Sequence, residues 1–260
     1  MKIKLLSLLV TTGSYKKFVE DICAMALLNK GSYVCVSNVH MIIEAHKNPA
    51  FAAVVNNADM ATPDGMPLVW AMKRLYGIQQ DRVAGMDLLP DLLQASALRK
   101  IPVYFYGTTQ HILEKTDEYV KANFPGLVLA GFYSPPFRAL TKQEETDIKD
   151  RINNSGAKLV FVALGCPKQE KWMASMKNNV NACMVGIGAA LPVMVGMQKR
   201  APLWMRNAGL EWFYRLLQEP GRLAKRYFVT NSLFIWLLFK SLAKQGFASK
   251  SVSDNGAMQQ

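Results

Sequence analysis

A carboxylate that directly follows an apolar run is the first residue of this sequence with the chemistry of a catalyst. Asp64 lies in Ala61-Thr-Pro-Asp-Gly-Met-Pro67, a segment typical of a strand end, a turn and a helix start. At the carboxyl edge of a parallel sheet, such a carboxylate can act as a general base and take a proton from a hydroxyl group, for instance that of a sugar. The alternative is that Asp64 and Gly65 only form the turn.

Polar side chains also follow the apolar run Tyr33–Val36. Ser37, Asn38 and His40 come after this run, again at the end of an expected strand. We expect these three residues to contribute to a substrate pocket. The alternative is that Ser37 or Asn38 caps the helix that follows, although a capping residue can also contact a ligand.

A third group lies where the apolar run 159–165 leads into a helix. Backbone N–H groups at a helix N-terminus, together with Lys168, suit an anion, and Gln169 could bind the edge of a base or a sugar. The alternative is that Pro167 occupies the first helical turn and that solvated charges follow it.

Arginines in two parts of the chain could bind phosphate. Arg82 lies in a loop that enters a helix, and residues 199–228 combine arginines with aromatic side chains. Guanidinium groups match phosphate in geometry, whereas Trp and Tyr favour the boundary between an apolar and an aqueous phase. Arg215, Arg222 and Arg226 are the candidates for binding a diphosphate, and the combination indicates a polyanionic substrate associated with a membrane.

The positive charge is concentrated near the C-terminus. The chain has a net charge of +12, and residues 199–250 contain ten Lys and Arg against two Glu, so about eight of these charges lie there. Such a segment favours an anionic membrane surface, a diphosphate or a nucleic acid. A non-catalytic RNA-binding protein is therefore an alternative, but no RNA-binding motif is present and the aromatic residues lie on long apolar helix faces. They could also belong to the core or to a homo-oligomer interface.

Apolar β-favouring runs alternate with helical patterns along most of the chain. We expect strands at 5–10, 33–37, 59–62, 103–107, 127–131, 159–165 and 182–188, and helices at 14–29, 109–123, 141–154 and 168–178. This alternation predicts an α/β fold of the Rossmann-like type, a mostly parallel sheet with helices on both faces. After Pro202 the strands end, and helices are expected at 203–218 and 222–244.

These patterns predict three parts. Residues 1–198 form an α/β catalytic domain, residues 199–245 a basic and aromatic helical appendage that associates with a membrane, and residues 246–260 a disordered tail. The longest apolar run, 233–239, is too short to cross a bilayer, so peripheral attachment is expected. The cysteines form no Cys-x-x-Cys motif, which favours a cytoplasmic protein without disulfides.

Several cofactor and metal motifs are missing. There is no P-loop, and Gly186-Ile-Gly188 is followed by Leu191 where a dinucleotide-binding sequence needs its third glycine. No Asp-x-Asp pair is present to hold a divalent ion on a sugar-nucleotide. We therefore expect no cofactor and no metal, with arginines and helix N-termini binding the phosphates.

Five segments, taken in order, resemble the WecG/TagA/CpsF family of bacterial glycosyltransferases. They are Thr62–Pro67, Arg82–Leu88, Gly165–Glu170, Lys199–Pro202 and Gly209–Pro220, and the resemblance extends from about residue 5 to about residue 240. It implies metal-independent, inverting transfer of a sugar from a nucleotide donor, usually UDP-linked, to a polyprenyl-diphosphate-linked sugar at the cytoplasmic membrane face. Members build teichoic acid linkage units, enterobacterial common antigen or exopolysaccharide.

The resemblance also implies roles for individual residues. Asp64 would be the general base, Asn38 and Gln169 would line the donor and acceptor pocket, and the three appendage arginines would approach the lipid diphosphate. Two positions depart from the family pattern. Ser37 stands where many members have threonine, and the acidic residue that many members carry near Leu191-Pro192 is absent.

Overall fold

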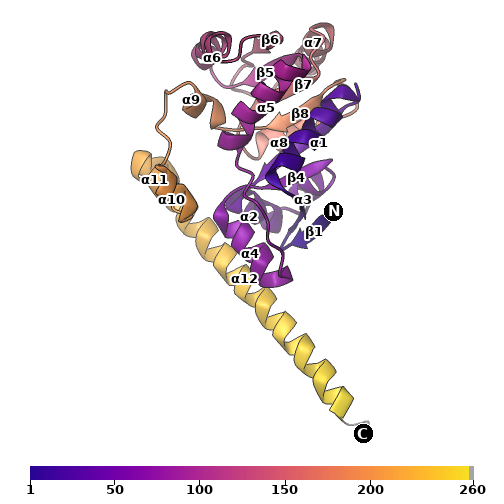
Figure 1. The fold of residues 1–260 in the computed structure, drawn as a ribbon, viewed down its shortest axis with the longest axis vertical. Coiled ribbons are helices and arrows are strands. Elements are labelled where there is room, and N and C mark those ends of the chain that lie inside the picture. Colours follow the sequence, from indigo (N-terminus) through magenta and orange to yellow (C-terminus); the bar gives the residue numbers. More distant parts are fainter. Residues whose placement is uncertain (258–260) are drawn as a thin grey trace.

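The fold is built on a six-stranded parallel sheet, seen in a computed structural model that describes residues 1–257 (Figure 1). The strand order is β4-β3-β8-β7-β5-β6. The strands are β3 (Ser32–Ser37), β4 (Met60–Pro63), β5 (Val103–Gly107), β6 (Leu129–Tyr133), β7 (Leu159–Ala163) and β8 (Cys183–Gly186). All neighbouring pairs are parallel, so every carboxyl end lies at the same edge of the sheet.

Helices cover both faces of this sheet, as the sequence predicts. Tyr104 and Tyr106 of β5 enter one core, whereas Val103 and Phe105 enter the other. One face carries α2 (Val39–Lys47), α3 (Pro49–Asn56), α4 (Met66–Tyr76), α7 (Lys142–Asn154) and α8 (Lys168–Met176); the other carries α1 (Tyr15–Leu27), α5 (Gly85–Arg99), α6 (Gln110–Asn123) and α9 (Ala190–Met194). Because the strands are buried on both faces, they are continuous apolar runs. The predicted α/β class is confirmed.

The N-terminal segment differs from the single strand expected at 5–10. It forms an antiparallel hairpin of β1 (Lys2–Leu5) and β2 (Leu8–Thr11), separate from the main sheet. Leu6 in the two-residue turn has a positive φ of 56°. An apolar run with no Gly or Asn contains no local signal for such a turn.

The segment expected to be one helix at 203–218 is two helices. α10 (Leu203–Asn207) and α11 (Glu211–Gln218) are separated at Gly209, whose φ is 70°. A Cβ atom at this position would lie 2.6 Å from the Trp70 ring. Gly209 therefore allows both the left-handed backbone and the close approach of the appendage to α4.

The last helix, α12 (Pro220–Ala257), begins two residues before the expected position and packs against α2 and α4. Phe234 and Leu237 enter the core on that face of the sheet. The helix extends to Ala257, and residues 258–260 of the tail expected at 246–260 lie outside the described part. Within the described residues, no helix combines the length and hydropathy needed to span a membrane.

Candidate active site

Asp64 follows β4 at the carboxyl edge of the sheet and is half-buried. Its backbone N–H donates to the carbonyl oxygen of Ser37 at 2.7 Å, which fixes the end of β4 beside the end of β3. Gly65, with a φ of 94°, then turns the chain into α4. Asp64 and Gly65 do form the turn that the sequence offered as an alternative to catalysis. The same turn places the Asp64 carboxylate at the carboxyl edge of the sheet.

The environment of Asp64 gives it an unusual proton affinity. Burial, followed by the nearby carboxylate of Glu211, raises the pKa of this carboxyl from 3.8 to about 7. The guanidinium groups of Arg82 and Arg215 oppose this rise, since they favour the ionised form. A carboxylate with a pKa near 7 is a stronger base than an ordinary one and is still substantially ionised at neutral pH, which suits a general base.

An ionic cluster beside Asp64 joins the α/β body to the appendage. The Asp87 carboxylate lies 3.0 Å from Arg82, 2.6 Å from Arg200 and 3.7 Å from Arg206. Glu211 lies 3.3 Å from Arg82 and 3.8 Å from Arg200. All five side chains keep between 16% and 29% of their surface exposed, so solvent or a ligand can reach them.

This cluster contains residues that we did not predict from the sequence. Arg82 was expected to bind phosphate, but Asp87, Arg200, Arg206 and Glu211 were not among the candidates. The available signal was their presence in the segments 82–88, 199–202 and 209–220. The Nε atoms of Arg200 and Arg206 are buried and have no hydrogen-bond partner among the described residues, so both guanidinium groups retain donor capacity.

The three predicted appendage arginines occupy different surroundings. Arg215 is close enough to Asp64 to affect its pKa. Arg226 similarly lies near His40, whereas Arg222 is exposed and donates to Glu219. Arg215 of α11 therefore lies near Asp64, Arg226 of α12 lies near His40, and Arg222 lies at the exposed start of α12.

At the end of β3, Asn38 caps a helix, whereas the side chain of Ser37 lacks a hydrogen-bond partner among the described residues. The Asn38 side chain accepts from the Met41 N–H at 3.1 Å and caps α2, as the structural alternative expected. The Ser37 hydroxyl is buried and has no partner among the described residues. Burial lowers the pKa of His40, and the charge of Arg226 lowers it further. His40 therefore favours its neutral form beside a cationic group.

The residues after β7 form an internal network. Gln169 accepts from the Gly165 N–H at 3.2 Å and donates to Glu170 at 2.7 Å, and it is only 4% exposed. Burial raises the pKa of Glu170, whose Oε2 atom has no partner among the described residues. Lys168 is exposed at the start of α8. Gln169 thus holds the Gly165 loop at the carboxyl edge, while Lys168 extends towards solvent.

The arrangement can support group transfer to a hydroxyl. It offers one carboxylate with raised pKa and a set of guanidinium groups that can offset negative charge on phosphate oxygens. Among the described side chains, no group of three or more His, Cys, Asp or Glu residues is arranged to hold a metal ion.

Known proteins match nearly the whole chain. A model of the glycosyl transferase WecG/TagA/CpsF family matches residues 3–247. An N-acetylglucosaminyldiphosphoundecaprenol N-acetyl-beta-D-mannosaminyltransferase from Bacillus spizizenii is 37% identical over 195 residues, 75% of this chain and 74% of the relative. A protein of the same name from Bacillus subtilis is 28% identical over 226 residues, 86% of each chain. The chain therefore belongs to the WecG/TagA/CpsF family and is a glycosyltransferase.

Proposed function

We propose that this enzyme transfers a sugar from a UDP-linked donor to a polyprenyl-diphosphate-linked sugar, with inversion at the anomeric carbon and without a metal ion. The observation that carries the proposal is the position of Asp64: a half-buried carboxylate with a pKa of about 7 beside a cluster of guanidinium groups. The names of the two Bacillus relatives support the acceptor class, since both describe transfer to N-acetylglucosaminyldiphosphoundecaprenol. The donor would be of the UDP-ManNAc, UDP-ManNAcA or UDP-glucose type.

In this mechanism Asp64 takes the proton from the acceptor hydroxyl. The hydroxyl oxygen attacks the anomeric carbon while the bond from that carbon to the donor diphosphate breaks, and UDP leaves with the bonding electrons. Arg82 and Lys168 would offset charge on the donor phosphates, and Ser37, Asn38, His40 and Gln169 would line the pocket for the sugars. Guanidinium groups would thus supply the charge stabilisation that a metal provides in other sugar-nucleotide enzymes.

Arg215, Arg222 and Arg226 would bind the acceptor diphosphate. They lie on consecutive helices of the appendage, and Arg215 affects the pKa of Asp64, which supports a diphosphate position next to the reacting hydroxyl. Arg222 and Arg226 lie further along α12, where the lipid chain would leave the site.

The appendage would attach the enzyme to the inner face of the bacterial cell membrane as a peripheral protein. Its exposed large apolar side chains support this: Trp204 on α10, Phe213 on α11, and Phe228, Trp236 and Phe239 on α12 are between 41% and 77% exposed. Exposed aromatic residues among basic ones are typical of membrane interfaces. The same apolar surface could instead join copies of the chain into a homo-oligomer. Family membership favours an enzyme over the RNA-binding alternative.

The test is an assay of purified protein with a panel of UDP-sugars and a polyprenyl-diphosphate-linked N-acetylglucosamine acceptor. We expect acceptor-dependent UDP release with one donor and a product whose anomeric configuration is inverted. EDTA should leave the rate unchanged. If UDP is released at the same rate without the acceptor, or if every donor leaves the acceptor unmodified, the proposed reaction is wrong.

A further inference from the structure

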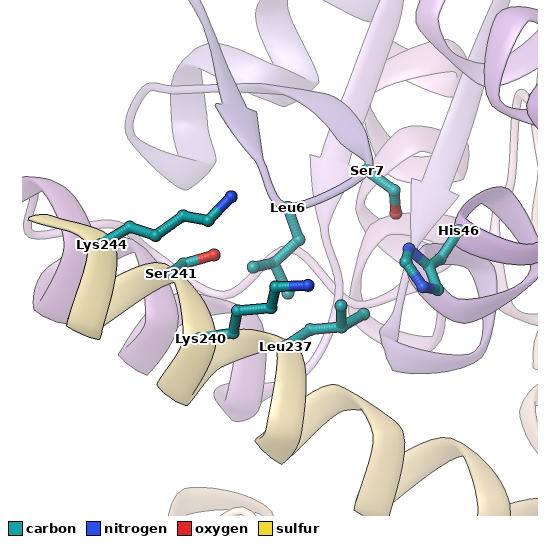
Figure 2. Close-up of a pocket in the computed structure, with 7 residues that line it drawn as sticks. All are labelled: Leu6, Ser7, His46, Leu237, Lys240, Ser241 and Lys244. Atoms are coloured by element: carbon teal, nitrogen blue, oxygen red, sulfur yellow. The ribbon is translucent and has the colours of Figure 1, made fainter.

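A cavity lies between α12 and the N-terminal hairpin, away from Asp64. Its volume is about 200 Å³, and it is lined by Leu6, Ser7, His46, Leu237, Lys240, Ser241 and Lys244 (Figure 2). Lys240 is fourteen residues after Arg226 on α12, which corresponds to about 20 Å along the helix. One diphosphate cannot reach both places, so the cavity is separate from the proposed acceptor site.

The polar groups of the cavity suit an anion. The ammonium groups of Lys240 and Lys244 extend from α12 into the space in front of the hairpin turn, and the His46 ring faces them from α2 (Figure 2). Ser241 adds a hydroxyl group, whereas the Ser7 hydroxyl donates its proton to the carbonyl oxygen of Ile42. Among the described residues, no carboxylate lines the cavity. Ammonium, imidazole and hydroxyl groups are all donors to phosphate oxygens.

The wall of the cavity requires an unfavourable backbone conformation. Leu6 has a φ of 56°, a value that is uncommon for a residue with a branched side chain. The Ser7 hydroxyl donates to the carbonyl oxygen of Ile42 at 2.6 Å, which ties the turn to α2. The turn therefore holds Leu6 against the apolar floor of the cavity, and strained backbone of this kind is concentrated at ligand sites.

The surroundings of the cavity favour a lipid headgroup over a free phosphate ion as the ligand. The Lys240 ammonium lies 4.8 Å from the centre of the Trp236 ring, and Trp236 is 52% exposed. Ile235 and Phe239 continue this exposed apolar surface on the same helix. A ligand with phosphate in the cavity could extend an acyl chain past Trp236 onto these residues, which a free phosphate ion does not require.

We infer that this cavity binds the headgroup phosphate of an anionic phospholipid. This proposal rests on the membrane attachment proposed above, because the membrane supplies the lipid. It does not depend on sugar transfer. It gives α12 two phosphate sites along its length, the acceptor diphosphate near Arg226 and a membrane lipid near Lys240. The lipid would hold the helix at a fixed depth and rotation while the acceptor binds and leaves.

The direct test is lysine labelling of the full chain with acetic anhydride, measured residue by residue by mass spectrometry. The arms are protein alone, protein with inorganic phosphate, and protein with phosphatidylcholine vesicles that either lack or contain phosphatidylglycerol. We expect the phosphatidylglycerol vesicles to protect Lys240 and Lys244 at least about tenfold more than Lys199 and Lys225, which are exposed lysines elsewhere in the appendage. Phosphatidylcholine vesicles and inorganic phosphate should protect neither pair.

Equal protection of both pairs would show non-specific attraction and overturn the proposal, as would labelling that vesicles do not change. Equal protection of the cavity lysines by millimolar inorganic phosphate would refute a lipid source. A second measurement compares vesicle affinity of the double variant Lys240→Gln/Lys244→Gln with that of the matched control Lys199→Gln/Lys225→Gln. We expect the cavity variant to lose about tenfold more affinity, whereas equal losses would contradict the site. Neither measurement needs sugar transfer, so a failed transfer assay would leave its result intact.

Discussion

Replacing Asp64 by asparagine should inactivate the enzyme and stabilise its fold at the same time. In the folded protein the pKa of this carboxyl is about 7 instead of 3.8, so folding disfavours its ionised form. Each tenfold difference in proton affinity corresponds to about 1.4 kcal/mol, which gives an upper bound of about 4 kcal/mol. Solvent around the half-buried side chain reduces this, and we expect about 1–4 kcal/mol.

The sign of the effect depends on pH. Between about pH 4 and pH 7 the folded state retains a proton that the unfolded state has lost, so stability falls as pH rises through this range. Above pH 7 the carboxyl is ionised in both the folded and the unfolded state, and the full free-energy cost of burying the charge persists. Asp64→Asn should therefore raise the free energy of unfolding at pH 8, with a Tm increase of about 2–4 °C per kcal/mol, and change it little at pH 4.

Activity should respond in the opposite direction. Loss of the general base should lower turnover by about 10²–10⁴-fold. In the unmodified enzyme, kcat/KM should fall about tenfold per pH unit below pH 7, because the base is then protonated. Melting curves and rate profiles on the same preparations measure both effects, and Asp150→Asn, an exposed carboxylate on α7, is the control that should change neither. An Asp64→Asn enzyme with normal turnover would remove the base role, and a Tm at pH 8 equal to or below that of the unmodified protein would refute the burial argument.

Three further changes test the appendage. Glu211→Gln removes a carboxylate that raises the pKa of Asp64, so the acidic limb of the kcat/KM profile should move to lower pH. Arg222→Glu should raise KM for a lipid-linked acceptor more than for a short soluble analogue, measured by steady-state kinetics on both. Gly209→Ala should lower the free energy of unfolding by about 1–3 kcal/mol in a urea titration, because it strains a left-handed backbone and collides with Trp70.

Each of these has an outcome that contradicts it. An acidic limb that stays in place would show that Glu211 does not act on Asp64, and equal KM increases for both acceptors would remove Arg222 from the diphosphate site. Gly221→Ala, where an added Cβ meets no atom within 4 Å, is the matched control for Gly209. Equal midpoints for the two alanine variants would contradict the packing of Gly209 on Trp70.

The sheet and the position of Asp64 could be predicted because their signals are local. Strands buried on both faces are continuous apolar runs, and the residue after β4 must lie at the carboxyl edge whatever the strand order. The hairpin turn at Leu6 could not be predicted, since its positive φ has no Gly or Asn to indicate it. The break at Gly209 had a local signal, but its contact with Trp70 depends on tertiary packing.

The ionic cluster was harder to predict because its members are far apart in the sequence. Asp87 and Arg200 are separated by 113 residues and meet only when the appendage packs on the body. Each was ordinary in its own segment, one as an acidic residue in the first helical turn and the other as one of many basic residues near the C-terminus. Charge composition favours a phosphate site, but it does not identify the arginines that lie near Asp64.

Asp87 forms ion pairs with Arg82 of the body and with Arg200 and Arg206 of the appendage. These ion pairs link the docking of the appendage on the body to the binding of a polyanion at the same arginines. If a bilayer and a polyanion bound at these arginines both favour the docked appendage, the membrane must raise the affinity of the arginine cluster for the polyanion. Thermodynamic reciprocity then requires that polyanion to raise the affinity of the protein for the membrane by the same factor. An enzyme built in this way would reside longest on the bilayer while its substrate is bound and would dissociate more readily after product release.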